Sequence, residues 1–333
     1  MFLCNKTLLA TIFTGVLLIT GCDQNTPKAT TEKSQVAKED TLVVARAGFK
    51  TKIIETNFEG DSAPITPPAE VFNLIHYPAK DGAMAAFITP DPKDNVKHPA
   101  VIWLVGGYGG IGSDDFFWAE QPKDNDQTGS AFRKAGITMM IPSFRGENGN
   151  PGRYEMFYGE LDDLESARSW LASQPWVDAN RIYVVGHSTG GTRALLASEL
   201  SDKYRAVFSL GGIPDLKKRI EGGKMMVNVP FDQTNPQEFK LRSPQFFISS
   251  IKVPTFYFEG EEYYWSEFDE IKASAKAQHI PLQVYKINGG DHFNIITPVS
   301  ETIAKKILSD TDSKTSISFD ATDIKSIESN IHH

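Results

Sequence analysis

Cysteine is scarce in this chain of 333 residues, which contains two, Cys4 and Cys22. The long remainder of the chain after Cys22 has no thiol. This excludes a disulfide framework, a thiolate metal site and a cysteine nucleophile from the part of the chain that can form a folded domain. Chemistry based on hydroxyl, carboxylate and imidazole groups remains open.

Long runs of positive charge are also absent from the sequence. Asp and Glu number 42 against 34 Lys and Arg, and the formal net charge is −8. An acidic chain of this kind is a poor candidate for binding nucleic acid or anionic lipid through its surface. We therefore expect no nucleic-acid partner, and no pattern in the sequence indicates a metal or an organic cofactor.

Apolar runs are short, and the clearest one lies near the N-terminus. The run from Leu8 to Ile19 is too short to span a bilayer but suits a secretory signal. The sequence Ile19-Thr20-Gly21-Cys22 resembles the bacterial lipobox, which implies cleavage before Cys22 and lipid attachment to it. An ordinary signal cleaved nearby is the alternative. We predict a signal peptide over residues 1–21 and a lipid-anchored cysteine with a polar tether over residues 22–40.

This interpretation predicts an exported protein, held at a bacterial membrane by its lipid and facing the periplasm. Asp23 follows the acylated cysteine, and in enteric-type lipoproteins such a residue resembles the signal for retention in the inner membrane. Membrane contact is expected only through the N-terminal anchor.

From residue 41 to residue 333, short apolar segments alternate with amphipathic ones, which predicts a single α/β domain with a mostly parallel sheet and helices on both faces. Phe72–Tyr77 and Met84–Thr89 are expected to pair around the turn PAKDG. In the tail, SISF (316–319) predicts one more strand, followed by a short helix with Ile324, Ile327 and Ile331 on one face.

A long insertion separates the predicted strands near residues 210 and 255. Residues 212–250 contain paired methionines and several phenylalanines. They predict either additional helices that cover the core or a lid over a binding cleft, because long loops in compact domains are often functional.

Ser188 stands in the pattern Gly-His-Ser-Thr-Gly, residues 186–190. A β-branched strand, Ile182–Val185, precedes it, and a helical segment, Thr192–Leu200, follows. This is the setting of a nucleophile elbow, in which flanking glycines allow a tight turn that lifts the serine hydroxyl above the sheet. We predict that Ser188 is a nucleophile rather than an ordinary turn serine.

A serine nucleophile needs a base, and in this chain order the histidine comes after the last core strand. His292 occupies that place, in the glycine-rich loop GGDHF. His187, inside the elbow, is expected to face away from the nucleophile. For the carboxylate that orients the base we take Glu262 first, with Glu261 and Asp215 as alternatives, because all three follow strand ends.

Stabilisation of a reaction oxyanion needs two N–H donors. One is expected from the backbone of Thr189, the residue after the nucleophile. The other is expected from the loop VGGYGG after an early core strand, where Gly107 or Tyr108 can approach a ligand closely. This loop lacks the Lys-Ser/Thr of a phosphate-binding P-loop and is followed by aspartates.

A family resemblance accompanies these motifs. IPSFRGENGNPGRY, then GELDDLESARSWLASQPWVDANRIYVVGHSTGG, and then GGDHF are similar to the catalytic domain of the prolyl oligopeptidase family, peptidase family S9, and to dienelactone-hydrolase-like esterases. The resemblance covers roughly residues 70–310 and implies an α/β-hydrolase with Ser188 as nucleophile and His292 as base.

The sequence departs from that family at three places. Tyr263 stands where family members often have the acidic residue, and Val105 stands where oligopeptidases often have a Tyr or His. The β-propeller that screens substrates has no counterpart among these residues, so peptide specificity is not implied. We predict a serine hydrolase acting on a small ester or short peptide. A non-catalytic binding protein that retains the fold is the alternative, because of Tyr263.

Overall fold

The computed structural model describes residues 41–55, 62–112, 114–223, 228–261 and 263–332. The signal peptide, tether, Cys22 and Asp23 predicted above lie outside these residues, and so does Glu262. Residues Asp40–His333 form one compact unit. In the described part of the chain, no helix is both long enough and apolar enough to cross a bilayer.

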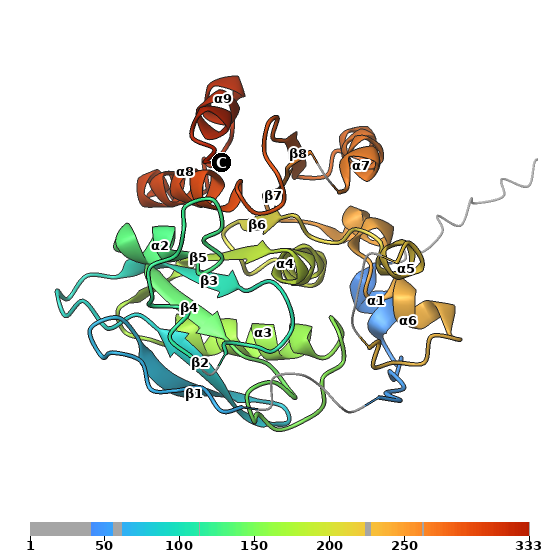
Figure 1. Cartoon of the computed structure of the whole chain (residues 1–333), viewed down its shortest axis with the longest axis horizontal. Coiled ribbons are helices and arrows are strands. Elements are labelled where there is room, and N and C mark those ends of the chain that lie inside the picture. Colours follow the sequence, from blue (N-terminus) through green and yellow to red (C-terminus); the bar gives the residue numbers. More distant parts are fainter. Residues whose placement is uncertain (1–40, 56–61, 113, 224–227, 262, 333) are drawn as a thin grey trace, which may run out of the picture. The chain divides into compact units, whose positions relative to one another are not determined.

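One mixed sheet organises the described residues, with eight strands in the order β1-β2-β4-β3-β5-β6-β7-β8 (Figure 1). The pairs β1–β2 and β2–β4 are antiparallel, and every later neighbour is parallel. The predicted α/β architecture and the hairpin around PAKDG are therefore confirmed. The strands are β1 (Asn73–Ala79), β2 (Gly82–Ile88), β3 (His98–Leu104), β4 (Thr138–Pro142), β5 (Val177–His187), β6 (Val207–Leu210), β7 (Thr255–Glu259) and β8 (Leu282–Lys286).

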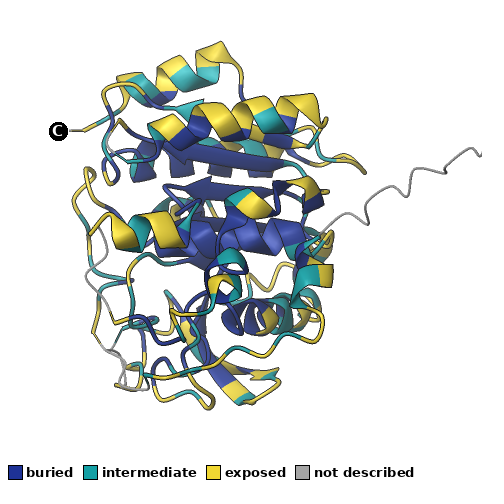
Figure 2. Ribbon diagram, turned by 90° about the vertical axis from the view of Figure 1, so that its right-hand side faces the viewer, coloured by how far each residue is buried: buried dark blue, intermediate teal, exposed yellow. Residues whose placement is uncertain are grey.

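Helices cover both faces of this sheet, because parallel strands must be joined by crossovers that pack above or below it. Figure 2 shows the strands as a buried layer between helices whose outer faces are exposed. The helices are α1 (Leu42–Arg46), α2 (Ser130–Lys134), α3 (Glu160–Ala172), α4 (Thr189–Leu200), α5 (Leu216–Glu221), α6 (Pro236–Lys240), α7 (Trp265–Ala277), α8 (Ile296–Ser309) and α9 (Ala321–Ser329).

Side chains of each central strand alternate between two cores. In β3, Val101 and Trp103 pack with α2, α8 and α9, whereas Ala100, Ile102 and Leu104 pack with α3 and α4. Successive side chains of a strand point to opposite faces, so a run of apolar residues is buried from both sides. This burial fixes the strand register and with it the positions of the loops at the strand ends.

The insertion between β6 and β7 is described except for residues 224–227, which include the paired methionines, and its described part mostly covers the core. Phe231, Phe239 and Phe247 pack with Leu42 and Phe157 in a separate apolar cluster. Figure 1 shows α6 beside the N-terminal segment that contains α1. Thr51 and the backbone N–H of Lys52 donate to Glu238 of α6, each at 2.8 Å. Of the two predictions for the insertion, helices that cover the core agree with these contacts, and we infer no lid.

The C-terminal tail differs in part from its sequence pattern. The helix is present as α9, but Ser316–Phe319 forms no strand. Phe319 instead packs on the sheet, meeting the rings of Phe256 and Phe258 edge-on at centroid distances of 5.1 and 5.0 Å. The sequence SISF predicts a strand, but its apolar side chains, Ile317 and Phe319, cover the sheet instead.

Candidate active site

Ser188 lies at the carboxyl end of β5, in a strained turn. Its φ is 54° and its ψ is −117°, a conformation that non-glycine residues rarely adopt. The flanking glycines are required: a Cβ on Gly186 would lie 2.2 Å from the Gly190 carbonyl oxygen, and a Cβ on Gly190 would lie 2.0 Å from that of Leu104. Such strain clusters at functional sites because it places a side chain for a task.

The loop after β3 borders the same serine. A Cβ on Gly106 would lie 3.2 Å from Ser188 Cβ, so the Gly106 backbone lies directly against the turn. The Thr189 hydroxyl donates to the Gly107 carbonyl at 2.7 Å and ties the loop to the start of α4. Gly107 has φ +74°, which glycine adopts without the usual steric cost. The Tyr108 ring packs edge-on against Tyr154.

His292 is held by a buried carboxylate. Its Nδ1 lies 3.1 Å from Glu259 Oε2 and 3.4 Å from Oε1. Glu259 is the last residue of β7 and is fully buried, and His292 is 6% exposed. The backbone N–H of Gly260 donates to Glu259 Oε1 at 2.9 Å and helps to fix the carboxylate. A histidine whose Nδ1 is bound by a carboxylate presents Nε2 for proton transfer.

The serine and the histidine–carboxylate pair meet at the end of β6. The N–H of Ser188 donates to the Leu210 carbonyl at 2.8 Å. A Cβ on the next residue, Gly211, would lie 2.4 Å from His292 Cε1 and 2.9 Å from Glu259 Oε2. The sheet therefore brings three residues far apart in sequence to adjoining positions at the carboxyl ends of parallel strands, where α/β sheets place their sites.

The carboxylates chosen from sequence lie elsewhere. Glu261 is exposed and accepts the Gly289 N–H at 2.8 Å. Asp215 caps α5, accepts the Lys218 N–H at 3.1 Å, and also accepts from Gln245 at 2.6 Å. Glu262 lies outside the described residues. Among the described carboxylates the one in hydrogen-bond contact with the His292 ring is Glu259, which the sequence reasoning did not consider.

A signal for Glu259 was present in the sequence. It is a charged residue at the end of the otherwise apolar strand TFYFE. A carboxylate at the inner end of a buried strand requires a partner, because an unpaired buried charge is costly. The candidates predicted from sequence all follow the ends of strands, whereas Glu259 lies inside one. Tyr263, where a carboxylate was expected, instead meets the His292 ring edge-on at 4.9 Å.

The position of His187 inside the elbow predicts that its ring faces away from the site. In the structure the ring instead lies beside His292. Its ring lies 4.7 Å from that of His292, and its Nε2 donates to the His292 carbonyl at 3.0 Å. Burial, followed by the nearby His292, lowers the pKa of His187 to about 3. His187 is therefore neutral at physiological pH, and its contact supports the backbone that carries His292.

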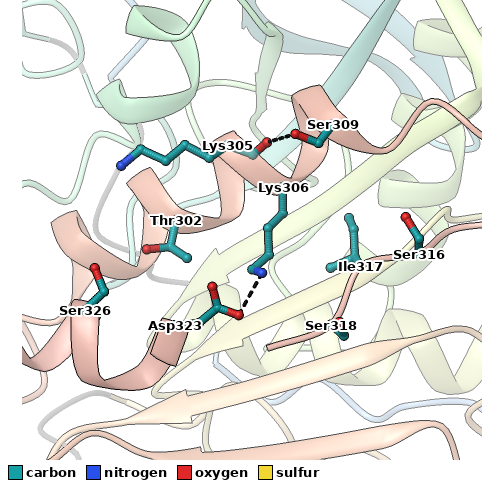
Figure 3. Close-up of a pocket in the computed structure, with 9 residues that line it drawn as sticks. All are labelled: Thr302, Lys305, Lys306, Ser309, Ser316, Ile317, Ser318, Asp323 and Ser326. Atoms are coloured by element: carbon teal, nitrogen blue, oxygen red, sulfur yellow. Dashed lines mark hydrogen bonds and ion pairs between the residues drawn. The ribbon is translucent and has the colours of Figure 1, made fainter. Parts of the chain in front are cut away.

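A cavity of about 380 Å³ lies away from Ser188, between α8 and the C-terminal segment (Figure 3). Lys306 faces Asp323 across it at 2.8 Å, and serine hydroxyls line much of the rest. The charges of that pair are mutually satisfied, and neither Ser188 nor His292 lines the cavity. We assign no catalytic role to it.

A mostly parallel sheet with a strained serine between its fifth strand and the following helix defines the α/β-hydrolase class. Residues 125–268 match the family described as the prolyl oligopeptidase family, Peptidase S9. The uncharacterized peptidase YtmA of Bacillus subtilis is 28% identical over 138 residues, which cover 39% of this chain and 54% of YtmA. The chain is thus an α/β-hydrolase resembling the S9 peptidases.

Solved structures agree on the fold. An acylaminoacyl peptidase of Pyrococcus horikoshii superposes with a TM-score of 0.59 and 18% identity, over 76% of this chain and 44% of that protein. An esterase of Pyrobaculum calidifontis gives 0.53 and 18%, over 73% of this chain and 87% of the esterase. The matched region spans about half the length of YtmA and of the peptidase. Together the comparisons support the α/β-hydrolase fold and the similarity to S9 peptidases.

Proposed function

We propose that this protein hydrolyses ester or amide bonds through an acyl-enzyme intermediate, with Ser188, His292 and Glu259 as its triad. The observation that carries the proposal is the buried Glu259–His292 hydrogen bond beside the strained serine. A serine hydroxyl is barely nucleophilic by itself, so a base whose orientation is fixed by a carboxylate is what distinguishes a hydrolase from a protein that only retains the fold.

The reaction follows from the roles of these groups. Ser188 Oγ attacks the substrate carbonyl carbon while His292 accepts its proton. Glu259 stabilises the resulting imidazolium. The Thr189 N–H, together with that of Gly107 or Tyr108, binds the oxyanion, and the α4 N-terminus adds a favourable dipole. His292 then protonates the leaving group, and a water molecule repeats the sequence to release the acid.

The alternative of a non-catalytic binding protein was motivated by Tyr263 in place of the acid. Glu259, at the end of β7 and four positions before Tyr263, offers His292 a carboxylate, so that motive no longer holds. Whether amides or esters are preferred depends on groups outside the triad, since both reactions use the same acyl chemistry.

The first test is labelling of the domain from Thr41 onward with a fluorophosphonate probe, read by intact mass. We expect one adduct on the parent and none on Ser188→Ala, whose hydrolysis of activated esters should fall by at least about 10⁴-fold. Circular dichroism of the variant serves as the folding control. An unlabelled but folded parent would exclude the triad and favour a binding role.

We also propose that the protein is exported and lipid-anchored through Cys22, with the hydrolase domain facing the periplasm. The support is the lipobox-like sequence and the polar stretch that follows it. In cells fed an alkyne-labelled fatty acid, the full chain should carry the label and sediment with membranes. Cys22→Ser should lose both properties, with Cys4→Ser, inside the predicted signal, as the matched control; a labelled Cys22→Ser variant would refute the anchor.

A further inference from the structure

A small cavity of about 180 Å³ adjoins the catalytic histidine. The insertion contributes Asp215, Lys218 and Arg219 to its lining, and the loop after β7 contributes Tyr263 and Tyr264. Tyr263 is shared between the cavity and the site, because its ring also meets His292 edge-on. A group bound in this cavity would therefore contact Tyr263, whose ring also contacts His292.

Arg219 is the unusual residue of this cavity. Its guanidinium carbon lies 4.7 Å from the Tyr263 ring centroid and 5.7 Å from that of Tyr264. At these distances the electron-rich faces of the rings attract the cation without using its N–H groups as hydrogen-bond donors. The Nη1 atom is buried and has no hydrogen-bond partner among the described residues. An unpaired buried donor is costly, so it calls for a partner such as an ordered water, an ion or a bound ligand.

The other charges of the cavity are already engaged. Lys218 forms an ion pair with Glu267. The Ser266 hydroxyl also donates to Glu267, at 2.5 Å. Asp215 accepts from the backbone of Lys218 and from Gln245. The described carboxylates near Arg219 thus have other donors, which leaves the guanidinium edge for an external acceptor.

The charge of Arg219 also reaches Tyr108. Burial raises the pKa of Tyr108, in the proposed oxyanion loop, and the charges of Arg193 and Arg219 oppose that rise. The guanidinium therefore interacts electrostatically with the proposed oxyanion loop. It also contacts Tyr263, whose ring meets His292. A substrate group that enters the cavity would therefore meet this cation.

Building on the proposed function, we infer that Arg219 binds a carboxylate of the substrate, so that the preferred substrates are esters or amides with a carboxylate a few bonds from the scissile carbonyl. The planar guanidinium edge matches a carboxylate. A phosphate dianion fits less well, because Asp215 and Glu267 in the same lining would repel its second charge.

The test compares 4-nitrophenyl hydrogen adipate with 4-nitrophenyl hexanoate, which differ in the terminal carboxylate. We expect the parent to favour the anionic ester in kcat/KM by on the order of tenfold at low salt, with the ratio falling as sodium chloride is added. Arg219→Gln should lose the preference, and Arg219→Lys should keep part of it because the charge remains. A purely structural role of Arg219 would lower both rates and leave the ratio unchanged.

Lys217→Gln is the matched control, since Lys217 is an exposed cation on the same helix and pairs with Glu221. It should keep the parental ratio. Hydrolysis of the neutral ester without preference for the anionic one, or an unchanged ratio in Arg219→Gln, overturns the inference while the proposed function stands. If the parent hydrolyses neither ester, the proposed function fails and the inference fails with it.

Discussion

At the scale of the residue, two glutamates in one short segment have opposite fates. Glu259 ends β7 inside the sheet, where its carboxylate receives one backbone N–H and contacts His292. Glu261, two positions later, lies on the surface and binds the backbone of Gly289. Both are acidic residues near the end of β7, and they differ in burial. Buried Glu259 contacts the histidine, whereas exposed Glu261 contacts a surface loop.

Replacing Glu259 by Gln should therefore lower kcat/KM for an activated ester by on the order of 10³-fold or more. The amide preserves the shape of the side chain but loses the charge that stabilises the imidazolium and can favour the wrong histidine tautomer. The measurement is steady-state hydrolysis with purified protein.

Glu261→Gln provides the control for that measurement, and its rate should stay within a few-fold of the parent. The reverse order, with Glu261→Gln inactive and Glu259→Gln active, would show that the triad acid has been misassigned.

At the scale of the element, helix α4 combines function at one end with a buried acid at the other. Its first residue, Thr189, supplies the proposed oxyanion N–H, and its first turn begins directly after Ser188. Near its C-terminal end, Glu199 is 3% exposed, and neither carboxylate oxygen has a hydrogen-bond partner in the described structure. Burial raises the pKa of Glu199 well above its usual value.

Glu199→Gln should consequently stabilise the protein, and more so as pH rises. Below the pKa of the unfolded chain, about 4.3, both parent and variant are neutral at this position. Above it, ionisation favours the unfolded parent, so the parent loses stability with rising pH while the variant does not. We expect the gap in Tm to widen between about pH 4.5 and pH 8.

Exposed Glu301 on α8 supplies the comparison, since Glu301→Gln removes the same charge where water solvates it. Thermal unfolding by circular dichroism at several pH values measures both variants. An identical gap for Glu199→Gln at every pH would contradict the assignment of a neutral buried acid.

At the scale of the whole molecule, Asp310 ties the end of α8 to the middle of the sheet. Its carboxylate accepts the Tyr183 hydroxyl of β5 at 2.7 Å, and Arg205, before β6, donates from Nε and Nη2, each at 2.9 Å. Burial by itself would raise the pKa of Asp310, but hydrogen bonds from Arg205 and Tyr183 outweigh it and lower the pKa to about 2. Segments more than 100 positions apart are joined here.

Asp310→Asn should destabilise the fold by about 3 kcal/mol at pH 7, because it leaves Arg205 without its buried anion. The native pKa is depressed, so the carboxylate stabilises the parent above about pH 4, its unfolded pKa, and this stability is lost as pH falls toward about 2. The difference between parent and variant should therefore narrow over that window. Urea unfolding at several pH values measures it.

Asp269→Asn removes the exposed partner of Lys286 and should cost no more than about 1 kcal/mol. If Asp310→Asn were as mild as this surface change, the tie between α8 and the sheet would contribute little to stability.

Much of the site was predictable because its local rules are strong. The elbow at Ser188 requires glycines at fixed spacing, and a histidine after the last strand follows from the order of the fold. The acid was not predictable in the same way. Several carboxylates stand near strand ends, and chain position does not say which one is buried. The contact of His187 with His292 and the cover that Phe319 gives the sheet also depend on partners far away in the chain.

The sequence by itself determined the alternation of strands and helices, the strained serine turn and the loop that carries His292, because these depend on neighbouring residues and on hydrophobic period. Only the tertiary structure decided that Glu259 holds His292 and that Arg219 contacts Tyr263, whose ring meets that histidine. The physical reason is that a carboxylate or a cation acts through depth and distance, which arise when β6, β7 and the insertion pack together and are not encoded at any one position.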